Sequence, residues 1–210
     1  MPALFALPLC AYLLGSISGS LLIGRFRRVD IRKQGSGNAG GTNALRTQGW
    51  RFALGVLLID VGKGALAVWL AGHWPWPLPS LSLSWVSTNW LVLLAAVAGH
   101  VWPLFHGFRG GKGVGTLLGG LLLIWWPGVA VFLAVGLLAL FLSGYVGLAS
   151  VLGALSLPLA AFLLPDASPQ LLPAAFVAAL IAFTHRQNIR RLLAGSENRF
   201  ERIRLLRRRS

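Results

Sequence analysis

Three stretches of the 210-residue chain concentrate residue types that bind anions. The first, residues 35–46, intersperses glycine with hydroxyl and amide side chains and ends in an arginine. Glycine lets backbone N–H groups converge on an anion, hydroxyl groups add donors, and arginine contributes a bidentate fork. This pattern favours a phosphate cradle over a flexible connector, the alternative interpretation. Its candidate ligands are Ser36, Gly37, Asn38, Thr42, Asn43 and Arg46.

The same glycines imitate a nucleotide-binding motif. Gly35, Gly37 and Gly40 spell G-x-G-x-x-G, and Asp60 follows twenty residues later. A dinucleotide site needs a strand before the glycines, whereas a charged loop precedes them here and Asp60 sits in an apolar stretch. Nicotinamide and flavin binding are therefore rejected, and no cofactor is expected.

The second stretch, residues 100–116, combines a lysine with glycines at the expected start of a helix, near Gly113. A helix N-terminus carries partial positive charge and attracts anions. The spacing does not match a P-loop, because His106 stands where the first glycine would be. A basic membrane anchor is the alternative, but it does not explain the glycines. The candidate ligands are His100, Gly110, Gly111, Lys112 and Gly113.

The third stretch, residues 184–197, follows the last apolar segment. On a continuing helix, His185 and Asn188 would share a face, with Arg191 close by. A basic anchor would explain the arginines of this stretch but not His185, Asn188 or Glu197.

Asp60 and Lys63 are ionisable residues inside an apolar segment, where unpaired charges are costly. Their spacing of three puts them on one helix face and predicts mutual pairing. The pair either ties helices together or supports the anion site from below.

The elements that must position these residues are membrane helices. Apolar residues make up 56% of the chain and charged residues only 11%, against about a quarter for soluble domains. The net charge of +14 could suggest nucleic-acid binding. However, the basic residues lie between long uncharged stretches, which excludes it. Four stretches long enough to span a bilayer are residues 2–24, 52–72, 85–105 and 145–164.

The basic residues also predict the topology, because cytoplasmic loops retain Lys and Arg. They concentrate in residues 25–51, 109–112 and 186–209, which should share the cytoplasmic side. Parity then requires residues 113–142 to form two spans, divided at residues 125–127, with two short spans of about 14 to 16 residues. We expect an all-α bundle of seven transmembrane helices, with the N-terminus outside and the C-terminus cytoplasmic.

Two flanking regions carry further expectations. Residues 73–84 lack Lys and Arg and are rich in Trp, as expected of an outer interfacial belt that includes Trp74 and Trp76. Residues 199–209 should form an amphipathic segment on anionic lipid. Cys10 is the only cysteine, so no intramolecular disulfide can form. The chain has no carboxylate cluster suited to Mg²⁺, so no metal is expected.

The sequence resembles the PlsY family, the bacterial glycerol-3-phosphate acyltransferases that use acyl phosphate. The resemblance covers nearly the whole chain, although Ala39, Gly41, Gly115 and Thr184 depart from the usual residues at the motif flanks. It rests on G-S-G-N-A-G-G-T-N-A-L-R, H-V-W-P-L-F-H-G-F-R-G-G-K-G-V-G-T and H-R-Q-N-I-R-R-L-L-A-G-S-E, with D-V-G-K-G at residues 60–64.

The resemblance implies that a fatty acyl group passes from acyl phosphate to the 1-position hydroxyl of glycerol 3-phosphate, giving lysophosphatidic acid. It implies a single transmembrane acyltransferase domain over residues 1–210, with a basic cytoplasmic tail over about 186–210. It places the enzyme in the bacterial inner membrane with a cytoplasmic active site, and makes the soluble enzyme that supplies acyl phosphate a candidate partner. The rival interpretation is a transporter of a phosphorylated solute, which would need polar residues on both faces.

With that resemblance, we expect Ser36, Arg46 and Lys112 to hold phosphate groups and the amides of Gly110 and Gly111 to neutralise developing charge. His185 and Asn188 would orient the attacking hydroxyl, and Glu197 would fix the arginines of the third stretch. Either His185 or a substrate phosphate oxygen would take the proton. For these roles to be joined, the three stretches must meet on the cytoplasmic side.

Overall fold

The computed structural model describes residues 2–73 and 85–200, and every regular element in these ranges is helical. The chain forms two compact units, Met1–Trp125 and Trp126–Ser210. Each is described separately here. Trp74 and Trp76 of the expected outer belt, and the tail from residue 201 onward, lie outside the described residues.

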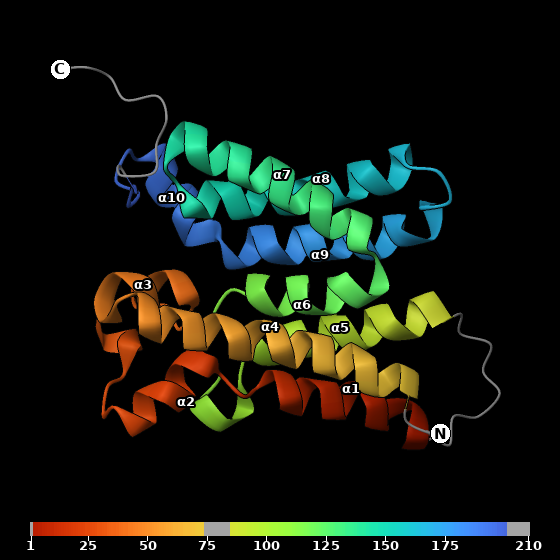
Figure 1. The fold of residues 1–210 in the computed structure, drawn as a ribbon, viewed down its shortest axis with the longest axis horizontal. Helices are drawn as coiled ribbons and strands as arrows, with labels where there is room; N and C mark the ends of the chain where they lie inside the picture. The colour runs from red at the N-terminus through yellow and green to blue at the C-terminus, as the bar shows by residue number, and fades with distance from the viewer. Residues whose placement is uncertain (1, 74–84, 201–210) are drawn as a thin grey trace. The chain divides into compact units, whose positions relative to one another are not determined.

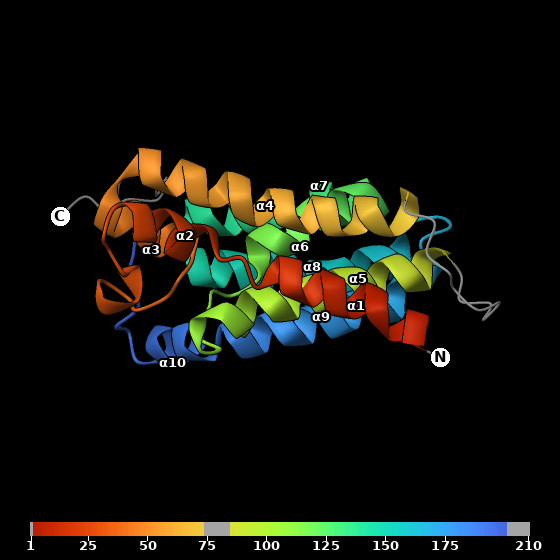
Figure 2. The ribbon, with the colours of Figure 1, turned by 90° about the horizontal axis from the view of Figure 1, so that it is seen from below.

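The first unit is built on long apolar helices that run side by side, α1, α4 and α5, with the shorter α6 (Figure 1). The shorter helices α2 and α3, together with residues 27–40 that connect them, lie at one end of the unit (Figure 2). The elements of this unit are α1 Pro2–Gly15, α2 Gly19–Phe26, η1 Ile31–Lys33, α3 Gly41–Gln48, α4 Trp50–His73, α5 Trp85–Val101, η2 Leu104–His106 and α6 Val114–Ile124.

The first apolar stretch, predicted as one span over residues 2–24, forms a broken helix. Helices α1 and α2 meet at an angle of 46°. The break follows from the sequence G-S-I-S-G-S at residues 15–20, because Ser18 is extended and Ser16, Ser18 and Ser20 are fully buried. Ser18 and Ser20 pair through their hydroxyl groups at 3.4 Å, and Ser16 and Ser20 also bond to backbone groups of the loops near Leu104 and Ala39.

Glycines allow the helices of this unit to pack backbone against backbone. A Cβ atom at Gly64 would collide with the carbonyl oxygen of Thr116, and one at Gly119 with that of Val61. Helices α4 and α6 therefore touch along a seam of small residues, as in small-xxx-small packing of membrane helices. Glycines in these apolar helices thus serve close packing.

The second unit contains three long helices and a short terminal one. Its elements are α7 Trp126–Ser143, α8 Val146–Leu163, η3 Ser168–Gln170, α9 Leu171–Thr184 and α10 Arg186–Leu193. The division expected at residues 125–127 is confirmed, since α6 ends at Ile124 and α7 begins at Trp126 with Pro127 in its first turn. Helix α6 has only 11 residues, fewer than predicted, and α7 has 18.

Several of these helices are long and apolar enough to cross a membrane. Within the described residues, four such helices occur, together with two bent pairs, α1 with α2 and η3–α9 with α10. Helix α6 is apolar but shorter. Exposed leucines such as Leu58 on α4 and Leu138 on α7 suit a lipid-facing surface. The fold is thus that of an α-helical integral membrane protein.

Candidate active site

The loop of the first stretch is organised by Asn43, whose side chain is buried in the first unit. Its Oδ1 accepts a hydrogen bond from the backbone N–H of Ser36 at 3.0 Å. Its Nδ2 donates to the carbonyl oxygens of Ile31 at 2.9 Å and Gln34 at 3.0 Å. Gly35, at φ +56°, passes so close that a Cβ there would collide with Oδ1. The amide of Asn43 therefore shapes the loop, and the substrate binding expected of this residue stays a prediction.

The other candidate ligands of this stretch are accessible. Ser36, Gly37 and Arg46 are exposed, and Asn38 and Thr42 are half-buried. Thr42 lies in the first turn of α3 and Arg46 in its last turn. The loop thus presents a hydroxyl and a guanidinium to a ligand while Asn43 holds its backbone.

The break between α1 and α2 touches both loops of the first unit. Ser20 donates its hydroxyl proton to the carbonyl oxygen of Ala39 at 2.8 Å. Ser16 accepts a hydrogen bond from the backbone N–H of Leu104 at 3.3 Å. Sequence reasoning missed this role, although the three serines and two glycines of residues 15–20 within an apolar stretch were a usable signal.

Arg32 provides a second connection between the loops. Its guanidinium donates to the carbonyl oxygens of His106 at 3.0 Å and Arg109 at 3.3 Å. Asp30 holds it from the other side, with Nη2 2.8 Å from Oδ2. The hydrogen bonds from the Arg32 side chain lower the pKa of the Asp30 carboxyl below its ordinary value of 3.8. Neither residue was singled out in the sequence.

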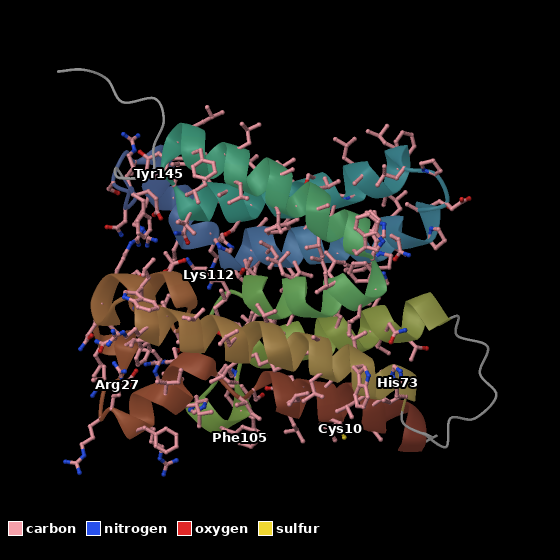
Figure 3. The ribbon with its side chains drawn as sticks, in the orientation of Figure 1. Cys10, Arg27, His73, Phe105, Lys112 and Tyr145 are labelled. Carbon is pink, nitrogen blue, oxygen red and sulfur yellow. The ribbon has the colours of Figure 1, made fainter. Side chains whose placement is uncertain are left out.

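The loop of the second stretch folds back on α5. The backbone N–H of Gly111 donates to the carbonyl oxygen of His100, and that of Gly110 to Val101, each at 3.1 Å. These two amides are thus bonded within the protein, and their role in neutralising developing charge stays a prediction. Lys112 is half-buried at the N-terminal end of α6 (Figure 3). Gly113 caps α6 at φ +88°, which confirms the expected helix start.

A buried charge network lies beneath this loop. The predicted pairing of Asp60 with Lys63 is confirmed, with Nζ 3.1 Å from Oδ1. His100 joins them, its Nδ1 lying 2.8 Å from Lys63 Nζ and 3.4 Å from Asp60 Oδ1. Asp60 also accepts the backbone N–H of Gly19 at 3.1 Å, so the network includes the α1–α2 break.

The third stretch lies in the second unit and is bent. Helices α9 and α10 meet at 59°, with His185 at the junction, so the continuing helix predicted through this residue is wrong. His185 is buried, and its Nδ1 lies 2.8 Å from the carbonyl oxygen of Ile181. A carbonyl oxygen can only accept, so in the neutral ring Nδ1 carries the proton and Nε2 is the unprotonated, basic nitrogen.

Glu197 binds two neighbours in this unit, as expected for a residue that fixes an arginine of the third stretch. Its Oε1 accepts from Asn188 Nδ2 at 2.6 Å, and its Oε2 accepts from Arg191 Nε at 2.7 Å. Asn188 packs closely against Gly147 of α8. The end of the described chain is fastened to the α7–α8 turn, where Tyr145 lies (Figure 3), through a hydrogen bond of 2.6 Å from Arg199.

The structure therefore brings the candidate residues together in two sets. In the first unit, the loops of residues 35–46 and 100–116 are tied by the α1–α2 break and by Arg32. In the second, His185, Asn188, Arg191 and Glu197 gather around α10. Within residues 2–73 and 85–200, no group of three His, Cys, Asp or Glu side chains is placed to hold a metal ion. The expectation of a metal-free reaction stays a prediction.

The apolar helices, with their polar and basic residues gathered in glycine-rich loops, define a polytopic α-helical membrane protein. Comparison with known proteins identifies its family. The family model described as glycerol-3-phosphate acyltransferase matches residues 5–195. The chain belongs to the glycerol-3-phosphate acyltransferase family and is an acyltransferase.

Curated relatives and solved structures agree with this assignment. A glycerol-3-phosphate acyltransferase of Pseudomonas paraeruginosa is 45% identical over 196 residues, covering 92% of this chain and 98% of the relative. One of Chlorobium phaeobacteroides is 40% identical over 220 residues, covering 90% and 93%. The crystal structure of PlsY (YgiH), an integral membrane glycerol 3-phosphate acyltransferase, in its glycerol 3-phosphate form has a TM-score of 0.82 and 36% identity, covering 95% of this chain and 96% of that one. Its lysophosphatidic acid form has a TM-score of 0.80.

Proposed function

We propose that this protein transfers a fatty acyl group from acyl phosphate to the 1-position hydroxyl of glycerol 3-phosphate. The hydroxyl oxygen forms a bond to the acyl carbon, the bond from that carbon to the phosphate oxygen breaks, and lysophosphatidic acid and phosphate leave. Support comes from the similarity to PlsY, which was solved in glycerol 3-phosphate and lysophosphatidic acid forms. Acyl phosphate as the donor rests on the resemblance of the three motifs.

The observation that carries this proposal is the position of Lys112. It follows two glycines whose amides are bonded to α5, and it stands at the N-terminal end of α6. Its ammonium group would clamp a phosphate, because a lysine beside a helix N-terminus favours an anion. Exposed Ser36 and Arg46 would bind phosphate oxygens too. Gly37, Asn38, Thr42 and Gly113 would line the same ligands, and Asn43 would act through the loop it holds.

His185 is our candidate for proton transfer. The hydrogen bond from its Nδ1 to Ile181 makes Nε2 the basic nitrogen of the neutral ring, and we assign the proton of the attacking hydroxyl to this atom. Asn188 would orient that hydroxyl, while Glu197 and Arg191 hold Asn188 and the α10 turn. A substrate phosphate oxygen is the alternative acceptor. Acyl phosphate is an activated anhydride, so positioning and charge stabilisation can carry much of the barrier.

We further propose that the chain acts as one acyltransferase domain in the bacterial inner membrane. The proposed topology has seven spans, the N-terminus outside, and all three motif stretches on the cytoplasmic face. The distribution of the 19 Lys and Arg residues supports this topology. The double variant Cys10→Ser, Lys33→Cys would test this topology. A membrane-impermeant maleimide should label this cysteine in inside-out vesicles and spare it in right-side-out vesicles. The reverse pattern would contradict the topology.

The activity is tested by phosphate release from palmitoyl phosphate by purified protein in EDTA. Release should require glycerol 3-phosphate and yield lysophosphatidic acid, whereas palmitoyl-CoA should give no product. Lys112→Ala should reduce turnover at least about 100-fold, since clamps on a reacting anion contribute that much. Lys33→Ala, which removes an equal charge from an exposed site, should leave turnover near normal. Normal turnover of Lys112→Ala would remove the clamp, and loss of wild-type activity in EDTA would refute the metal-free reaction.

A further inference from the structure

Lys63 is buried in α4, and each of its three ammonium protons has an acceptor. Nζ lies 2.8 Å from the carbonyl oxygen of Ile17 in the α1–α2 break. It lies 3.1 Å from Asp60 Oδ1 and 2.8 Å from His100 Nδ1. The ammonium group is therefore saturated by three fixed partners.

With Lys63 protonated, this arrangement selects the tautomer of His100. An ammonium group can only donate, so beside it Nδ1 of His100 accepts and carries no proton. If Nδ1 were protonated toward Asp60, its hydrogen would meet an ammonium hydrogen across a separation of 2.8 Å between Lys63 Nζ and Nδ1. The neutral ring consequently has its proton on Nε2.

The Nε2 atom of His100 lies against the loop of the second stretch. A Cβ at Gly111 would collide with this atom, so glycine is needed for the imidazole to reach this position. The bond from the Gly111 N–H to the His100 carbonyl oxygen holds the loop there. Within the residues that the structure describes, the polar contacts of the His100 ring are all made by Nδ1. The Nε2–H group thus lies against Gly111, the residue before Lys112. Neither of the contacts made by Nδ1 uses this N–H as a donor.

We propose that Lys63 is a positioning residue that fixes His100 as an Nε2–H donor to a phosphate oxygen bound beside Lys112. The identity of this anion rests on the proposed function, and its phosphate can belong to glycerol 3-phosphate or to acyl phosphate. Asp60 keeps Lys63 charged and in place. The buried ion pair therefore serves recognition of an anion through a neutral histidine.

The tautomer is tested without any assay of activity. Full-length protein labelled with ¹⁵N-histidine in nanodiscs has four histidines, and His100→Gln identifies the signal of His100. The expected wild-type spectrum shows a neutral ring with an unprotonated Nδ1 and a protonated Nε2. In Lys63→Met, which keeps the length of the side chain, Nδ1 should become protonated in part of the population. A wild-type imidazolium or Nδ1–H tautomer would overturn the proposal, whether or not the enzyme uses acyl phosphate.

The role of His100 Nε2–H as a donor is tested by replacing the histidine with glutamine or asparagine, whose side-chain amides differ in length. The amide nitrogen of glutamine can replace Nε2, whereas that of asparagine replaces Nδ1. His100→Gln should retain turnover within about 5-fold, and His100→Asn should lose about 10- to 100-fold, as expected for a lost hydrogen bond to a charged group. A rise confined to the KM of glycerol 3-phosphate or of acyl phosphate would identify the source of the phosphate. Equal activity of the two variants, or a better asparagine variant, would contradict the donor role.

Discussion

Arg32 bonds to His106 across 74 positions of the sequence, with Nη1 3.0 Å from the carbonyl oxygen. One guanidinium therefore connects the loop before α3 to the loop before α6. Arg109 accepts from the same nitrogen at 3.3 Å, and Asp30 orients the group from the opposite side. The relative position of the two candidate phosphate loops depends on this side chain as well as on buried serines.

Loss of this connection should weaken catalysis without removing a ligand. We expect Arg32→Gln to lower turnover about 3- to 10-fold, because misplaced ligands reduce the fraction of productive geometries. Lys33→Gln removes the same charge from the next residue and should have little effect. Steady-state rates of phosphate release measure both variants. Equal losses would mean that only net charge matters.

The Asp30 pair should persist in mildly acidic solution. The pKa of Asp30 is lowered by its hydrogen bonds with Arg32, so its contribution to stability is present above the ordinary value of 3.8 and disappears as the pH falls through the lowered pKa. The stability difference between wild type and Asp30→Asn should be less than about 1 kcal/mol and constant from pH 8 to about 5. It should shrink below about pH 4. Thermal unfolding in detergent measures it, and a difference that shrinks already near pH 6 would argue against the pair.

The hydroxyl group of Ser20 should contribute measurably to the stability of the protein. Its hydroxyl and the carbonyl oxygen of Ala39 are 2.8 Å apart, and both residues are fully buried. We expect Ser20→Ala to cost about 1–3 kcal/mol of stability, because it leaves a buried carbonyl without this partner. Ser150→Ala is the control, since the Ser150 hydroxyl bonds within its own helix to Val146. The control should change the unfolding free energy by less than about 0.5 kcal/mol.

The glycine seam between α4 and α6 can be tested with one substitution at two positions. Gly119→Ala forces a methyl group into the backbone of Val61, whereas a methyl group at Gly62 has nothing within 4 Å. The first variant should lose about 1–3 kcal/mol from overpacking. The second should be neutral or gain up to about 1 kcal/mol, because alanine favours helix. Unfolding in detergent compares them, and similar stabilities would contradict the close contact.

Glu197 should need both of its carboxylate oxygens. In Glu197→Gln one of them becomes an amide group, which cannot accept from Asn188 Nδ2 and Arg191 Nε together. We expect a loss of about 1–3 kcal/mol and slower turnover. Asp166→Asn makes the matching change at an exposed turn of the same unit and should be silent. An unaffected Glu197→Gln variant would exclude a need for both acceptors.

Periodicity and charge predicted much of this structure. The division between α6 and α7 at Trp126 followed from parity and a proline, and the contact of Asp60 with Lys63 followed from a spacing of three. Contacts between distant backbone groups could not be predicted in this way. The amides of Gly110 and Gly111 bond to carbonyl oxygens of α5, which no side-chain pattern reports. The same holds for Asn43, whose residue type suits a ligand and a loop support equally well.

The contact between α4 and α6 limits where a fatty chain can lie. Where a carbonyl oxygen of one helix lies against the Cα of a glycine on the other, as at Gly119 and Val61, no methylene group fits between them. A hydrocarbon tail is excluded from this seam. Any discrimination between short and long acyl donors must therefore arise on other helix faces, and substitutions along this seam should alter stability while leaving chain-length preference unchanged.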